Sequence, residues 1–170
     1  GYPVERAMRD CRINMILEGS SEIMKLFLAR EAMDPHLKEI MALAKGKLST
    51  GQTIFKIFKL LGYYTWWYPS QWVKSFFSKS YKDFGPLAKH MKFIERTSHD
   101  LARYIFYYMA RYQQGLESKQ MILGRLMDIG TDLFIMAATC SYAVSLTKEN
   151  SEDKAPLQLA DYFCQKARRR

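Results

Sequence analysis

Two long stretches of the sequence place apolar residues at spacings that alternate between three and four positions. The first runs from Leu87 to Tyr112 and the second from Ile122 to Val144. This spacing puts the apolar residues of each stretch on one side of an α-helix. Alternating β-branched runs and the Asn-Gly or Asp-Gly turns typical of hairpins are nearly absent. The pattern therefore predicts an all-α fold.

Further helices are predicted from residues that favour helix starts and stops. Pro3 suits the first turn of a helix that ends near Glu18 and Gly19. The hydroxyls and the carboxylate of Ser20–Glu22 favour the start of a second helix, since they suit its positive end. Asp34–Pro35 is a similar signal, with Asp as the cap and Pro in the first turn, and it predicts a third helix.

Polar breaks divide the C-terminal half of the chain. Gln113–Ser118 is predicted to be a turn, Glu149–Lys154 a charged loop, and Pro156 the start of the last helix. Three helices joined by such short connections predict an antiparallel bundle over residues 86–170.

Composition excludes several classes of protein and site. With 48% hydrophobic and 14% aromatic residues, the chain is not of the disordered type. The three cysteines, Cys11, Cys140 and Cys164, are far apart and odd in number, so we expect a reducing compartment without a disulfide framework. Neither cysteines nor histidines show metal-ligand spacing, so no metal is expected. The net charge of +9 suits an anionic partner, but no RNA or DNA motif accompanies it, and nucleic acid is not expected.

Targeting and membrane-spanning segments are not expected. The first ten residues mix both charge signs, unlike a signal peptide. The apolar run Leu133–Leu146 is shorter than the roughly 20 residues that a membrane span needs, so a buried core helix is predicted there. The chain opens at Gly1 in the middle of a helical pattern, and we expect it to be cut from something longer.

Two strings near the start carry a family resemblance. Tyr-Pro-Val-Glu-Arg-Ala-Met-Arg-Asp-Cys-Arg-Ile begins at Tyr2, and Ile-Leu-Glu-Gly-Ser-Ser-Glu-Ile begins at Ile16. Together they resemble the C-terminal signature of the acyl-CoA dehydrogenases over about the first 35 residues. The remainder is similar to the helical extension of the very-long-chain branch and its bacterial relatives. The resemblance implies the end of the catalytic helical domain at residues 1–45, a basic aromatic connection at 46–85 and the bundle extension at 86–170.

The resemblance also implies site residues and a reaction. Glu18 corresponds to the catalytic base, Gly19 to a substrate contact, and Ser20, Ser21 and Glu22 to the segment that contacts FAD. The implied reaction is α,β-dehydrogenation of long-chain acyl-CoA in fatty acid β-oxidation. The implied partners are electron-transfer flavoprotein and a second subunit of a homodimer. The acyl- and flavin-binding β-domain is not part of this sequence, so the chain alone is expected to be inactive.

The residues themselves leave other interpretations open. A Glu before a Gly between two helices is usually a solvated loop residue. A non-catalytic helical module for membrane tethering or dimerisation is the alternative function. In contrast, a helix N-terminus with small, hydroxyl-bearing side chains suits a phosphate-bearing ligand, and this agrees with the FAD interpretation.

The stretch Gln52–Phe84 is basic and aromatic, with all three tryptophans, five lysines and a single acid. Apolar residues at i, i+3, i+4 and i+7 from Ile54 predict an amphipathic helix. Aromatic rings and lysines together favour a membrane–water boundary with anionic headgroups. Alternatively, the rings pack on the catalytic domain or on a second subunit. We expect a cytoplasmic protein, peripheral on the inner face of a membrane, or on the mitochondrial inner membrane in a eukaryote. The membrane-facing candidates are Phe55, Lys56, Phe58, Lys59, Trp66 and Trp67.

Overall fold

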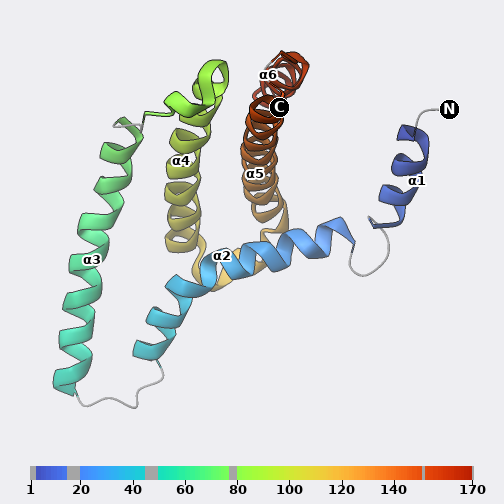
Figure 1. Ribbon diagram of the computed structural model, residues 1–170. Coiled ribbons are helices and arrows are strands. Elements are labelled where there is room, and N and C mark those ends of the chain that lie inside the picture. The colour runs from blue at the N-terminus through green and yellow to red at the C-terminus, as the bar shows by residue number, and fades with distance from the viewer. Residues whose placement is uncertain (1–2, 15–19, 45–49, 77–79, 151, 170) are drawn as a thin grey trace.

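The computed structural model describes residues 3–14, 20–44, 50–76, 80–150 and 152–169. Every regular element within these ranges is helical, which confirms the predicted all-α fold (Figure 1). The elements are α1 (Val4–Asn14), α2 (Ser21–Ala44), α3 (Thr50–Phe76), η1 (Lys82–Leu87), α4 (Ala88–Tyr112), η2 (Gln113–Ser118), α5 (Gln120–Glu149) and α6 (Ala155–Ala167), where η denotes a 3₁₀ turn.

The bundle is formed by α4, α5 and α6. Helices α4 and α5 run antiparallel through the η2 turn, and α6 packs back on α5 (Figure 1). The two predicted apolar faces meet here: Leu87 and Ile94 from the first stretch are buried with Leu133 and Cys140 from the second. Burial of these side chains is the main stabilising contribution to the bundle, at about 1.5–3 kcal/mol for each large one.

Helix α5 lies at the centre and contacts α2, α4 and α6. It therefore buries a second row of side chains, including Leu123, Met127 and Met136, which the single predicted face missed. Ile129 belongs to the predicted apolar side of the stretch Ile122–Val144 but is 43% exposed, because no described helix covers that side. Within the described residues α5 is the one helix long and apolar enough to cross a membrane. Its side chains toward α2, α4 and α6 are buried, but others, such as Phe134 at 73% and Tyr142 at 67% exposed, face outward, so the predicted buried core helix is confirmed only in part.

A partly buried polar contact holds α6 on α4. The Asp161 carboxylate accepts hydrogen bonds from Nε2 of the fully buried His90 and from Nζ of Lys89, each at 2.8 Å. Gln165 donates to the other oxygen at 2.7 Å. Hydrogen bonds from Lys89 and His90 lower the pKa of Asp161 to about 2, because they favour its charged form. The ion pair thus orients α6 while the apolar contacts hold it.

Helix α2 runs without interruption past the position where a third helix was predicted. Pro35 lies inside it, and the Asp34 carboxylate pairs with Lys38 one turn later instead of capping a new helix. Figure 1 shows that α2 changes direction part-way along its length, as a proline inside a helix commonly causes. The helix persists because Ala29 and Met33 pack on α5 while His36 contacts α3.

One face of α3 packs on α4 and α2 through aromatic rings. Phe106 of α4 stacks on Tyr64, with ring centroids 4.9 Å apart, and also contacts Trp67 and Tyr68. His36 of α2 shares a hydrogen bond of 2.7 Å with the Tyr64 hydroxyl. Burial among these rings lowers the pKa of His36. This aromatic cluster sets the direction of α3 and decides which of its faces remains exposed.

Candidate active-site segment and the exposed face of α3

The predicted cofactor contacts lie where α2 begins. The carbonyl oxygen of Ser20 accepts the first helical hydrogen bond, from Met24 N at 3.0 Å, so Ser20 is the residue that precedes the first turn. Ser21 and Glu22 are exposed in that turn. The start at Ser20–Ser21 agrees with the predicted helix boundary. Glu18 and Gly19, predicted as base and substrate contact, lie outside the described residues.

The start of α2 is held in place by its contacts with α5. Lys25 Nζ lies 2.7 Å from Asp128 Oδ1, one turn after Ser21. One turn further on, Ala29 is buried against the side chains of α5 and η2. An alanine at this crossing allows the two helices to approach closely. The bundle therefore supports the segment that carries the predicted FAD contacts.

Helix α1 lies apart from the bundle in Figure 1, beyond the N-terminal end of α2. Its ion pairs are internal: Arg9 Nε lies 2.9 Å from Glu5, and Arg6 lies 3.9 Å from Asp10. These pairs are exposed and contribute little to stability. Its apolar residues Val4, Met8 and Ile13 are exposed within the part of the chain that the structure describes. They are free to pack on further protein.

The residues at the start of α2 fit part of a flavin nucleotide. Two serine hydroxyls and the first amide groups of a long helix can donate hydrogen bonds to phosphate oxygens. The carboxylate of Glu22 cannot donate, and its charge opposes a phosphate, so it suits a hydroxyl donor instead. Ser20 and Ser21 thus fit the phosphate part of FAD, whereas Glu22 fits a hydroxyl of the same molecule.

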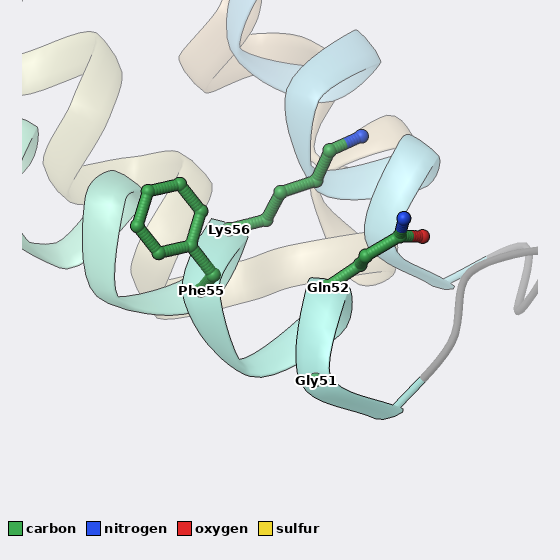
Figure 2. A pocket seen from close by; sticks show the side chains of 4 residues that line it. All are labelled: Gly51, Gln52, Phe55 and Lys56. Atoms are coloured by element: carbon green, nitrogen blue, oxygen red, sulfur yellow. The ribbon is translucent and has the colours of Figure 1, made fainter.

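The side of α3 opposite its aromatic cluster is exposed and apolar. Trp66 is 80% exposed, and Phe55 and Phe58 are each 71% exposed. Lys56 and Lys59 lie on the same helix, which carries no acidic residue. Figure 2 shows the shallow hollow at its first turn, where Phe55 points away from Lys56 and Gln52. We call the exposed side, formed by Ile54, Phe55, Phe58, Leu61, Trp66 and Val73, the outer face of α3.

The structure corrects the predicted orientation of Trp67. Its ring lies 5.7 Å from Phe106 and 5.6 Å from His36, between centroids, so it packs inward. Trp66, the next residue, points outward because successive residues of a helix are 100° apart. The sequence alone could not decide between the two tryptophans, because the signal that Phe106 and His36 cover one side lies in other helices.

The fold, the exposed start of α2 and the two strings at the N-terminus all agree with one family. The profile described as ACAD9/ACADV, C-terminal domain, matches residues 85–170, and the acyl-CoA dehydrogenase C-terminal domain matches residues 1–33. The first match covers just over half of the chain. The chain therefore belongs to the acyl-CoA dehydrogenase family.

Particular relatives are similar over nearly the whole chain. The probable acyl-CoA dehydrogenase FadE10 of Mycobacterium bovis is 44% identical over 167 residues, which cover 97% of this chain. FadE10 of Mycobacterium tuberculosis has the same identity and coverage. The chain spans about a quarter of the length of these relatives, 26%. No solved structure matches the chain.

Proposed function

We propose that this chain forms the C-terminal part of an FAD-dependent acyl-CoA dehydrogenase that acts on long-chain acyl-CoA in fatty acid β-oxidation, with Glu18 as the base. The observation that carries the proposal is the pairing of family membership with two serine donors at the start of α2, the half-buried Ser20 and the exposed Ser21. The flavin would supply the hydride acceptor that no side chain can provide.

The roles of the residues follow from the chemistry of the α-proton. This proton is weakly acidic, so its removal needs a carboxylate that is positioned and partly shielded from water. Glu18 would accept it, and Gly19 would let the backbone approach the thioester closely. Ser20 and Ser21 would donate hydrogen bonds to the cofactor phosphates, and Glu22 would accept one from a cofactor hydroxyl.

A Glu18→Gln substitution in the whole natural protein tests the assignment. We expect flavin absorbance to remain, because the amide keeps the shape of the side chain. The rate of flavin bleaching by a long-chain acyl-CoA should fall about 10²- to 10⁴-fold, as for loss of a general base. Glu31→Gln, on an exposed side of α2, is the matched control and should bleach at the normal rate.

Two results would count against the proposal. Rapid bleaching in Glu18→Gln would show that another group removes the proton. A natural protein without flavin would support the alternative, a non-catalytic helical module for tethering or dimerisation. The proposal also includes electron-transfer flavoprotein as the electron acceptor and a homodimeric assembly. A coupled assay that follows reduction of electron-transfer flavoprotein tests the first, and the mass of the protein in solution tests the second.

A second proposal concerns the outer face of α3, for which we infer peripheral contact with an anionic membrane. The observation that favours it is the exposure of Phe55, Phe58 and Trp66 beside two lysines on a helix without acids. Aromatic rings suit the membrane interface, and each lysine near an anionic surface contributes about 1 kcal/mol. The protein would then be cytoplasmic and peripheral on the inner face of a membrane, or lie on the mitochondrial inner membrane in a eukaryote.

Flotation with vesicles that contain phosphatidylserine tests this contact. Reversing both charges with Lys56→Glu and Lys59→Glu should lower the fraction of protein bound to vesicles at least tenfold, because two side chains attracted to the anionic lipid are replaced by two that it repels. Lys148→Glu with Lys154→Glu, on α5 and in the loop before α6, changes the net charge equally and should bind normally. Equal loss of vesicle binding in the two double variants, or no binding by the unaltered protein, would refute the membrane proposal.

A further inference from the structure

Two cysteines from different helices meet in the core of the bundle. The sulfur atoms of Cys140 on α5 and Cys164 on α6 lie 3.6 Å apart, and both residues are fully buried. Apolar side chains of the same core, including Leu133 and Met136, surround them. A disulfide bond is about 2.05 Å long, so an approach of about 1.5 Å would join the two sulfurs. The third described cysteine, Cys11, is exposed on α1.

We propose that Cys140 and Cys164 are an oxidisable dithiol, which a hydroperoxide converts to a disulfide that ties α6 to α5. The thiolate of one cysteine attacks the peroxide, the O–O bond breaks, and a sulfenic acid and hydroxide form. The second thiol then attacks this sulfur, the S–O bond breaks, and water leaves. In total, two thiols lose two electrons and two protons, and hydrogen peroxide is reduced to two molecules of water.

The closed structure protects the pair, so oxidation depends on movement of α6. Burial raises the pKa of Cys140 to about 12 and also raises that of Cys164, which keeps the thiolate scarce. Helix α6 is short, with 13 residues, and packs chiefly on α5, and short elements with few neighbours detach locally at less cost than global unfolding. Its detachment exposes Cys164 to peroxide. Return of α6 then brings the sulfenic acid back to Cys140, where the disulfide closes.

The experiment uses the whole natural protein with Cys11→Ser, so that an exposed thiol does not compete. The protein is treated with hydrogen peroxide, denatured, alkylated and digested with trypsin. We expect residues 126–148 and 155–166, the tryptic peptides that hold the two cysteines, to appear as one crosslinked species. Both thiols should be lost at the same rate and return after reduction. Peptides are mapped because the ten methionines also gain oxygen and obscure the intact mass.

Variants separate a paired reaction from independent oxidation. With Cys164→Ala, the crosslinked species should be absent and the Cys140 thiol should be lost more slowly, because no second thiol is present to convert a sulfenic acid to a disulfide. Asp161→Asn weakens the hold on α6 and should speed crosslinking by up to about tenfold. The proposal is overturned if both thiols survive a peroxide treatment that oxidises Cys11 in the unaltered protein, if they end as separate oxygenated products, or if Asp161→Asn leaves the rate unchanged.

Discussion

Substituting Asp161 by Asn tests how much the ion pair beneath α6 contributes to stability. The carboxylate pairs with Lys89 and with the buried His90, and its pKa falls from 3.8 to about 2. At about 1.36 kcal/mol per tenfold change in proton affinity, this corresponds to about 2.4 kcal/mol. Because the side chain is 29% exposed, water screens part of that energy. We therefore expect Asp161→Asn to lower the free energy of unfolding by about 1–2 kcal/mol at neutral pH.

Denaturant unfolding, followed by circular dichroism between pH 2 and pH 7, is the assay. The sign follows from the lowered pKa: the contribution is complete above the unfolded value near 4 and is lost as the pH falls towards 2. The difference between the unaltered protein and Asp161→Asn should therefore shrink to about 0.4 kcal/mol at pH 2, where the carboxyl of the folded protein is about half protonated. Asp128→Asn, which removes a more exposed pair with Lys25, is the control and should cost less than about 1 kcal/mol. Equal losses in the two variants, or a difference that keeps its full neutral-pH size at pH 2, would refute the reasoning.

Three other predictions test separate parts of the fold. Phe106→Ala should destabilise the protein by about 1–3 kcal/mol, since the ring is half-buried, and shift the tryptophan fluorescence of α3; an unshifted spectrum would contradict the packing. Gly85→Ala should cost about 1–3 kcal/mol in thermal unfolding because φ is +49° there, whereas Gly124→Ala, within α5 and with open space at its Cβ position, should be neutral or stabilising. The pKa of His36 is lowered by burial, so stability should decline as the pH falls below about 6.5, and His36→Phe should flatten that part of the pH profile.

The helices of the bundle could be predicted because their signal is local. The spacing from Leu87 onward identifies α4, and its predicted residues do line the core. The same reasoning found one side of α5 but not the second, because periodicity shows that a helix is buried without showing how many neighbours cover it. The start of α2 was predictable from Ser20, since capping depends on adjacent residues.

Contacts between distant residues could not be predicted in this way. His90 and Asp161 are 71 positions apart, and Cys140 and Cys164 are 24 positions apart in different helices. No local pattern links such partners. The helix start predicted at Asp34–Pro35 was wrong because distant contacts outweigh a local preference. Proline does favour the first turn of a helix, but packing on both sides of α2 keeps that helix continuous. Which tryptophan of α3 faces outward likewise depends on rings supplied by α2 and α4.

The central position of α5 has a consequence for the order of folding. Its contacts with α4 and α6 join segments that are neighbours in the sequence, whereas its contact with α2 closes a loop of about 90 residues. Short loops close at a lower entropic cost, so α4, α5 and α6 should assemble first and offer α2 a preformed surface. The segment that carries the candidate active site would then be the last to dock. During synthesis on the ribosome, α2 emerges before the bundle, so it stays undocked until most of this sequence has been made.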